Sequence, residues 1–382
     1  MDLSPVLKWL EERALTAPGK SGVRCLLRFL CPADYRRFAR EWAERHPPGT
    51  PDAPAVRLLP LIRGVIFTLP PGPPAGSPWA GCALEQDARV AVHGTVRSVP
   101  AVEQGIPWGV RQIRAPSAWR QTTGNGIKVG VIDTGVDFNH PDLRHAISRG
   151  INLLARSMLP HDDNGHGTHI AGTIAAANQP YGMMGVAPRA IIHPVKAFDH
   201  NGSAYVSDII LGIEWCVRNR MDIINMSFGM KTRSRALLAA VRNAWNAGII
   251  VVASSGNDAK RKAIDYPARF PQTVSVGATT RMRRIAPFSN RGSLIDIYAP
   301  GDKILSTWLR GKYNEMSGTS MATSHVSGAI ALLLAYRPGL KPAEIKEILR
   351  RSAQPLRGSK ATKRTGEIDV PRMLAAADRL KS

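Results

Sequence analysis

Residues 127–133 read IKVGVID, a short and mostly apolar run that begins after Gly126 and ends in an aspartate. Three further runs have the length and composition of buried strands, namely IIHPVKAF at 191–198, MDIINMSF at 221–228 and GIIVVAS at 248–254. Helical patterns alternate with them, among them residues 207–220 and 235–248. This alternation predicts an α/β fold in which a parallel sheet is covered by helices on both faces.

The first hundred residues have a different pattern. Residues 22–102 predict the order strand, helix, strand, strand, helix, strand, which is that of a small ferredoxin-like α+β unit. The second of these helices is expected over PWAGCALEQDA, residues 78–88. The start of the chain, MDLSPVLKWLEERAL, predicts a short amphipathic helix. We therefore expect a helical extension at 1–21, a small domain at 22–102 and a large α/β domain at 103–382.

Composition and charge argue against several classes of protein. The 382 residues carry a net charge of +22, but the basic residues are scattered, and their densest runs are 260–262 and 281–284. Because no aromatic residues are interleaved with these runs, we do not expect nucleic acid as the main partner, and salt-dependent retention on DNA would test that alternative. No run of eighteen apolar residues is present, so no membrane span is expected. The four cysteines match neither a zinc site nor a disulfide framework.

The N-terminus also bears on the compartment. It lacks the basic start and apolar core of a secretory signal. We therefore predict a cytoplasmic protein. A misassigned start codon or a different export route would lead to secretion instead.

Four polar residues stand where distant segments of such a sheet meet. Asp133 ends a strand and Asn257 follows another, while His166 opens a helix. Ser320 precedes the apolar helix that runs through residues 329–335. Acyl transfer needs a nucleophile, a base, a carboxylate that orients the base, and donors for the oxyanion. Together these four residues supply each of those groups.

Each residue taken alone has a simpler explanation. Asp133 could close a turn, and Ser320 could cap a helix. His166 and His169 are three residues apart, but the HExxH pattern of zinc proteases is absent, so we expect no zinc site. His169 and His325 are expected to pack and form hydrogen bonds in the interior. It is the joint occurrence of the four groups that favours chemistry.

Four motifs carry a resemblance to a known family. They are DTGVD at 133–137, HGTHIAGT at 166–173, SSGN at 254–257 and GTSMA at 318–322. In this order they resemble the signature segments of the subtilisin-like serine proteases (subtilases, peptidase family S8), whose triad follows the chain order Asp, His, Ser. The similarity extends from about residue 103 to about residue 353. It implies a subtilisin-like fold and a serine endopeptidase made as a zymogen.

The resemblance assigns a role to each group. Ser320 becomes the nucleophile and His166 the general base, with Asp133 orienting the imidazole. Asn257 and the backbone N–H of Ser320 become the oxyanion hole. Ser324 departs from the family, which normally has proline there, and we expect this change to retune the site without abolishing catalysis. The alternative is a relative that binds peptides without cutting them, which the presence of all four groups disfavours.

The resemblance also implies a groove for protein or peptide substrates. Two segments are expected to hold the substrate backbone between them as an added strand, and their residues are Gly202, Ser203, Ala204, Ser227, Phe228 and Gly229. Asp265 is expected at the base of the pocket for the side chain before the cut, near Asp258. Two carboxylates would favour Lys or Arg before the cut, unless the cations at 260–262 neutralise them.

Members of this family often bind a structural calcium ion. The ligands that the resemblance implies here are Gln104, Asp142, Ala177, Gln179, Tyr181 and Met183. Asp142 would supply a carboxylate, and backbone carbonyls would supply much of the remaining shell. Gln179 stands where the family usually has the shorter asparagine.

Residues 22–102 fit the propeptide of this family, which acts as an intramolecular inhibitor. Its tail would lie in the active-site cleft and be cut by the enzyme itself. Alignment places the cut after Val102, whereas a preference for basic residues would favour the bond after Arg97. Both bonds remain open at this point.

Overall fold

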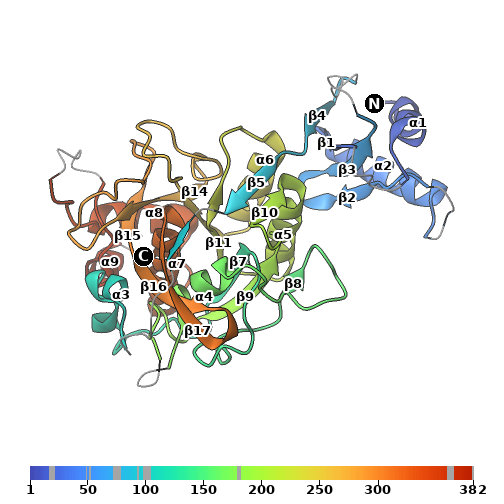
Figure 1. The fold of residues 1–382 in the computed structure, drawn as a ribbon. Coiled ribbons are helices and arrows are strands. Elements are labelled where there is room, and N and C mark those ends of the chain that lie inside the picture. Colours follow the sequence, from blue (N-terminus) through green and yellow to red (C-terminus); the bar gives the residue numbers. More distant parts are fainter. Residues whose placement is uncertain are drawn as a thin grey trace.

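The computed structural model describes residues 1–16, 22–48, 50, 53–71, 79–92, 94–97, 105–178, 182–358 and 365–380. A large body holds most of the chain, and a smaller part formed by the N-terminal residues lies against one side of it (Figure 1). No helix among these described residues is both long enough and apolar enough to cross a membrane.

The large body is built on a sheet of seven strands whose paired neighbours all run parallel, in agreement with the prediction. The four predicted runs form its centre, and three strands that the sequence pattern did not predict extend it. In spatial order the strands are β15 (Ile297–Pro300), β14 (Thr273–Thr279), β13 (Ile250–Ser254), β11 (Ile223–Met226), β7 (Lys128–Asp133), β9 (Ile191–Lys196) and β8 (Ile151–Asn152).

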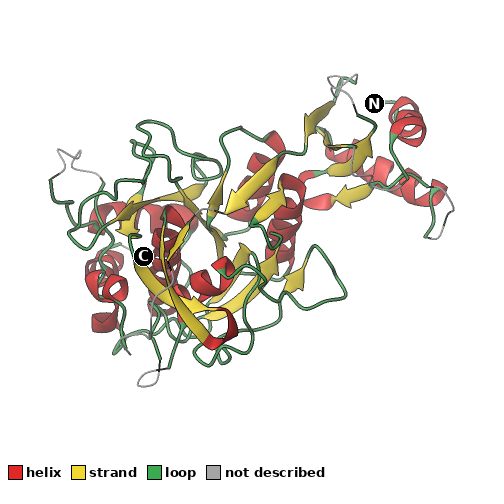
Figure 2. Cartoon of the chain, viewed as in Figure 1, coloured by secondary structure: helices red, strands yellow, loops and turns green. Residues whose placement is uncertain are grey.

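Helices cover both faces of this sheet, as Figure 2 shows. Neighbouring residues of one strand enter different cores: Val252 packs with the helices of one face, while Val251 packs with those of the other. The first face carries α4 (His166–Ala175), α7 (Thr319–Tyr336), α8 (Pro342–Ser352) and α9 (Val370–Asp378). The second face carries α5 (Val206–Arg218) and α6 (Arg235–Asn246).

The N-terminal part is a small α+β unit, as expected, but the last strand predicted for it is not in its sheet, because residues 89–92 and 95–97 pair with strands of the large body. Its sheet has the order β2 (Arg57–Leu59), β3 (Gly64–Leu69), β1 (Val23–Phe29) and β4 (Cys82–Gln86), with antiparallel pairing throughout. Two helices, α1 (Ser4–Arg13) and α2 (Pro32–Arg45), share one apolar core with this sheet.

The helix predicted within residues 78–88 is wrong, because Cys82–Gln86 forms strand β4. The physical reason lies at the start of the chain. Val6, Leu7 and Leu10 of α1 are fully buried in the core of this unit, so α1 covers sheet surface that a second helix would otherwise have to cover. The strand then buries Cys82 in the same core.

The remaining strands lie at the edges of the large body. β5 (Arg89–Val92) runs between β10 (Ser203–Tyr205) and β12 (Phe228–Gly229). β6 (Thr95–Arg97) pairs with β17 (Lys312–Ser317), which pairs in turn with β16 (Ile304–Trp308). The short helices are α3 (Trp108–Gln112) and the 3₁₀ turns η1 (Pro60–Ile62), η2 (Ala115–Ala118) and η3 (Leu309–Gly311).

Candidate active site

An aspartate and a histidine meet at the carboxyl end of the sheet. Asp133 is the last residue of β7 and His166 is the first residue of α4. Nδ1 of His166 lies 2.7 Å from Oδ1 of Asp133, and both side chains are buried. The same oxygen accepts the backbone N–H of Thr134 at 2.8 Å. The carboxylate therefore fixes the orientation of the imidazole ring in an interior that excludes water.

Glycine makes this approach of strand and helix feasible. A Cβ at position 167 would lie 2.2 Å from the carbonyl oxygen of Gly135, which is far inside van der Waals contact. Gly135 itself has a φ of 112°, a conformation that residues with a side chain rarely adopt. The motifs DTG and HG therefore serve the close contact between the two segments as well as their chemistry.

Ser320 lies in the first turn of α7, where the N–H groups of a helix point away from its body. Its hydroxyl donates to the carbonyl oxygen of Ser227 at 2.7 Å, and its side chain is buried. Ser324, one turn further along, donates its hydroxyl to the carbonyl of Met321 at 2.7 Å. The hydroxyl that replaces the usual proline is therefore satisfied within the helix, and α7 continues without a break.

Asn257 joins this site through the residue before Ser320. Its Oδ1 accepts the backbone N–H of Thr319 at 2.9 Å and the hydroxyl of Thr319 at 2.8 Å. The amide oxygen is thus engaged by the start of α7, which leaves the NH₂ group to donate elsewhere. The structure therefore brings Asn257 to Thr319, the residue before Ser320, and brings Asp133 to His166.

Two other histidines of these motifs serve packing, as expected. Nε2 of His169 donates to the carbonyl oxygens of Ile304 and Asn314, and Nδ1 of His325 donates to the carbonyl oxygen of Met321. Burial lowers the pKa of His169 to about 3 and that of His325 to about 4. Both rings are therefore uncharged at neutral pH.

Sequence reasoning missed a buried cation beside Asp133. Lys196, at the end of β9, donates to the carbonyl oxygen of Thr134 at 2.6 Å and to Asp163 at 2.6 Å. Asp162 accepts the hydroxyls of Thr134 and Thr168. These contacts tie the end of β7 to the start of α4, and no motif marks the lysine because its role depends on the neighbouring strand.

Five of the six residues expected to hold substrate backbone lie beside an extended strand, and that strand belongs to this chain. The sixth, Ser227, is not among the described pairs, and its carbonyl oxygen accepts the hydroxyl of Ser320. β5 pairs on one edge with β10, where Ala91 opposes Ser203 and Val90 opposes Ala204. On the other edge it pairs with β12, where Val92 opposes Phe228. The full register also pairs Arg89 with Tyr205 and Ala91 with Gly229. The N–H of Val92 donates to the carbonyl of Gly202 at 2.9 Å.

The chain then continues past the aspartate–histidine pair. An ideal Cβ on Gly94 would lie 3.9 Å from Cδ2 of His166 and 3.8 Å from the carbonyl oxygen of Ser317. From Thr95 onward the chain pairs with β17, and Thr95 opposes Ser317, three residues before Ser320. The N-terminal segment therefore pairs first as β5 with β10 and β12, and then as β6 with β17. Figure 1 shows β5 beside β10 in the large body.

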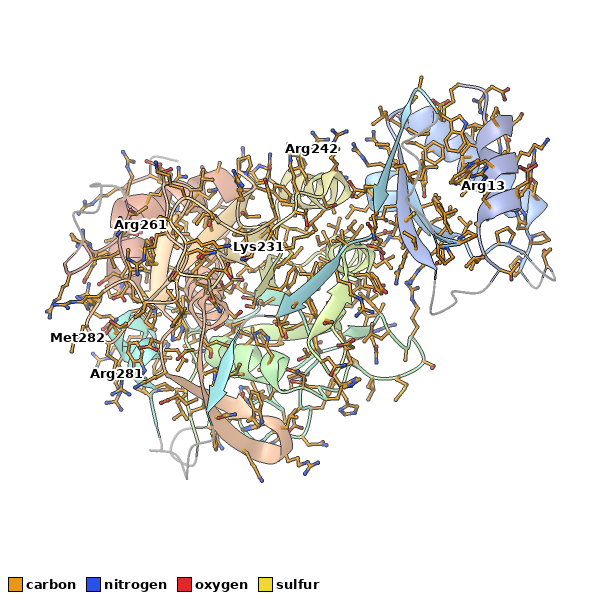
Figure 3. All side chains as sticks on the ribbon, turned by 45° about the horizontal axis from the view of Figure 1, so that its top comes forward. Arg13, Lys231, Arg242, Arg261, Arg281 and Met282 are labelled. Atoms are coloured by element: carbon orange, nitrogen blue, oxygen red, sulfur yellow. The ribbon has the colours of Figure 1, made fainter. Side chains whose placement is uncertain are left out.

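Asp265 and Asp258 lie together, and a cation that the sequence did not suggest holds both. Nζ of Lys231, the residue labelled near the middle of Figure 3, lies 2.9 Å from Oδ1 of Asp265 and also contacts Asp258. Burial raises the pKa of Asp265, whereas the hydrogen bond from Lys231 lowers the pKa of Asp258. Among the described residues the ion pairs to these carboxylates come from Lys231, and the charge of Lys260 also acts to lower the pKa of both carboxyl groups.

The expected calcium ligands are only partly described, since Gln104, Gln179 and Tyr181 lie outside the described residues. Asp142 receives three protein donors: Nδ2 of Asn178 at 2.6 Å, the N–H of Met183 at 2.9 Å and the hydroxyl of Tyr313 at 2.8 Å. Within the described ranges two of these donors use Oδ2 and one uses Oδ1, so a lone pair is left on Oδ1. The described part contains no cluster of three or more His, Cys, Asp or Glu residues suited to a metal.

The loop beside Asp142 is nevertheless shaped around its carboxylate. A Cβ at Gly182 would lie 2.3 Å from Oδ1 of Asp142, so only glycine permits this approach. Ala177 is also tied to the site, because its N–H donates to the carbonyl of Asp142 at 3.0 Å. The described residues therefore fit a cation through one oxygen of Asp142, provided that the Asn178 amide turns away.

Comparisons with known proteins agree with this geometry. The profile described as "Subtilase family" matches residues 124–369. Subtilisin E of Bacillus subtilis (strain 168) is 42% identical over 275 residues, which are 71% of this chain and 72% of that protein. A subtilisin of Bacillus pumilus is 44% identical over 255 residues, or 65% of this chain and 92% of that protein. An alkaline protease of Shouchella clausii is 41% identical over 275 residues, covering 72% and 71%. The chain therefore belongs to the subtilase family and is a serine-type endopeptidase.

Proposed function

We propose that this endopeptidase cuts peptide bonds through an acyl-enzyme on Ser320, with His166 as the base and Asp133 as the group that orients it. The observation that carries this proposal is the 2.7 Å hydrogen bond between buried Asp133 and His166, beside a groove that already holds an extended strand. The burial of the pair strengthens their interaction, because little water is present to screen it.

In this mechanism the Ser320 hydroxyl turns from the Ser227 carbonyl toward His166. Its oxygen attacks the substrate carbonyl carbon, while its proton passes to Nε2 of His166. The N–H of Ser320 and the NH₂ of Asn257 donate to the resulting oxyanion. His166 then gives the proton to the leaving amine nitrogen, and the C–N bond breaks. Water repeats these steps on the ester, releasing the acid and restoring Ser320.

We further propose that residues preceding the large body act as an intramolecular inhibitor and that the enzyme cuts the bond between His93 and Gly94. Residue 93 lies outside the described residues, but its neighbours on both sides support the choice. Val92 is the last residue paired with the groove, and Gly94 lies beside His166. This register favours neither of the two bonds considered from the sequence, since Arg97 pairs with Glu315 and Val102 lies outside the described residues.

Intact-mass analysis of the purified wild type beside Ser320→Ala tests both parts of this proposal. Wild type should yield a fragment that begins at Gly94, and the alanine variant should remain whole. A fragment that begins at residue 98 or 103 would show that the enzyme processes itself but does not cut between His93 and Gly94. Processing of Ser320→Ala would remove Ser320 as the nucleophile, and an intact wild type that leaves casein uncut would favour a peptide-binding relative.

The proposed preference for Lys or Arg before the cut is weakened by Lys231. Two carboxylates and one ammonium leave one negative charge in this pocket. We therefore expect only a modest preference for Arg over Phe or Leu in peptide assays. Lys231→Met should raise kcat/KM for Arg peptides by about tenfold and leave that for Phe peptides nearly unchanged. An unchanged ratio would show that Asp258 and Asp265 do not face the substrate.

Calcium at Asp142 remains a proposal as well. If the ion binds, it adds stability without taking part in the chemistry, and EDTA should lower the melting temperature. An unchanged melting temperature would reject the site.

The comparisons do not support the cytoplasmic location, which remains a prediction from the sequence.

A further inference from the structure

A second concave site lies away from the substrate groove and is lined by positive charge. Its volume is about 1050 Å³, just above the usual range of about 300–1,000 Å³ for small-molecule sites. Five cations line it: Arg261, Lys262, Arg284, Arg291 and Arg357. They come from three separate segments of the large body, so the fold, and not a local run of basic residues, gathers them.

No carboxylate among the described residues neutralises these five cations. None of the five cations forms an ion pair within the described ranges, and no acidic residue lines the cavity. The acidic residues of the same segments are already paired elsewhere, since Asp265 contacts Lys231, Glu367 contacts Arg283, and Asp296 contacts Lys346. Five like charges around one cavity repel one another, and a bound anion would relieve that repulsion.

One of the five carries a buried donor that lacks an acceptor. Nε of Arg291 is inaccessible to solvent, and no described residue accepts its hydrogen bond. A buried polar group without a partner is costly, so its presence here calls for a ligand atom or an ordered water. An anion oxygen at the inner end of the cavity would meet this requirement.

The walls of the cavity are held in place by backbone contacts. The N–H of Lys262 donates to the carbonyl of Arg291 at 2.7 Å, and the N–H of Arg291 donates to that of Lys260 at 2.8 Å. Lys262 has a φ of 60° and Ala259 a φ of 58°, both in the left-handed region that glycine prefers. Such strain persists only where the surroundings impose it, and it is concentrated at functional sites.

We propose that this cavity binds a small anion with several phosphate groups. Guanidinium groups donate two parallel hydrogen bonds to phosphate oxygens, and four of the five cations are arginines. The cavity is also much larger than one phosphate group, and Ile264, Ile285 and Leu294 give it an apolar wall. That combination fits an oligophosphate attached to an organic ring better than an inorganic ion alone.

Titration calorimetry with tripolyphosphate and with ATP tests the proposal on the full chain. We expect each probe to bind once per chain, and ATP to bind more tightly because its ring can contact the apolar wall. The double variant Arg261→Ser/Arg357→Ser should weaken both by about tenfold or more. Both side chains are exposed and form no ion pair in the described structure, so the variant should fold.

Arg120→Ser/Arg242→Ser is the matched control, since it removes the same charge at two exposed sites outside the cavity. Figure 3 labels Arg242 on α6 and Arg261 at the end of the large body away from the N-terminal part. If both double variants weaken the binding of the probes equally, the loss of affinity would come from the lower net charge, and the proposed site would be wrong. The absence of saturable binding would also overturn it. So would a DNA duplex that binds more tightly than ATP with the same sensitivity to Arg261→Ser/Arg357→Ser.

Discussion

The two main sheets of this protein bury their faces in different ways. Helices of the large body cover both faces of the seven-stranded sheet. Consecutive residues such as Val251 and Val252 point to opposite faces, and both are buried in cores of the large body. The N-terminal sheet covers only one face with α1 and α2. On its other face Leu26 and Ile66 pack with residues of α5 and α6, which belong to the large body.

Polar contacts also hold the N-terminal sheet against α5 and α6. Glu85 accepts the N–H groups of Arg235 and Ala236 at the start of α6, and Asp87 accepts that of Ser207 at the start of α5. Carboxylates are favourable at helix starts, where N–H groups lack partners within the helix. The N-terminal part therefore buries the second face of its sheet only by packing against the large body.

The largest expected effect is a loss of catalytic rate, caused by a substitution that lies wholly in the large body. Asn257→Ala should lower kcat while KM changes little, because its amide acts on the oxyanion of the transition state. In subtilisin itself, loss of the oxyanion-hole asparagine costs about 100- to 1000-fold in rate. Peptide hydrolysis kinetics would measure this effect. On chains that also carry Ser320→Ala, Asn257→Ala should leave the hydrogen exchange of β5 unchanged, and a loss of β5 protection there would show a structural role instead.

Adjacent leucines of β1 offer a sharper comparison, since both are buried but face opposite sides. Leu27→Ala should destabilise the core of the N-terminal part by about 2–5 kcal/mol. Leu26→Ala should instead weaken the packing against α5 and α6.

Hydrogen exchange on chains that also carry Ser320→Ala would separate the two effects. Leu27→Ala should increase exchange in β1 and β3, and Leu26→Ala should increase it chiefly in β5 and at the starts of α5 and α6. The same exchange pattern in both variants would mean that the two parts unfold as one unit.

A smaller effect concerns pH at the contact between the two parts. Burial raises the pKa of Asp87 to about 6, although Arg24 at 2.9 Å acts in the opposite direction. A raised pKa in the folded protein means that the stabilisation is complete below the ordinary value of 3.8 and is lost as pH rises through about 6.

Urea unfolding of the Ser320→Ala chain at pH 4 and at pH 7.5 would measure this dependence. Asp87→Asn should reduce the difference in unfolding free energy between the two pH values by about 3 kcal/mol or less. An identical difference in both chains would show that Asp87 titrates normally.

Sequence pattern predicted the elements whose signal is local. The runs at 127–133 and 248–254 contain strands because short segments of apolar, β-branched residues fit a buried sheet. The motifs around His166 and Ser320 predicted helix starts, and both residues lie in the first turn of a helix. The segment at 82–86 could not be assigned in this way, since its state depends on α1, seventy residues earlier.

By itself, the sequence determined the α/β class, the small N-terminal α+β unit and the family, because short apolar runs and four ordered motifs carry that information locally. Only the tertiary structure decided which cations meet which carboxylates. Lys231 reaches Asp265, and Lys196 reaches Asp163, across segments 33 or more residues apart. The tertiary structure alone also gathered five cations at one cavity and set the register of β5 beside His166. Such contacts depend on how strands and loops pack together, and no local pattern encodes them.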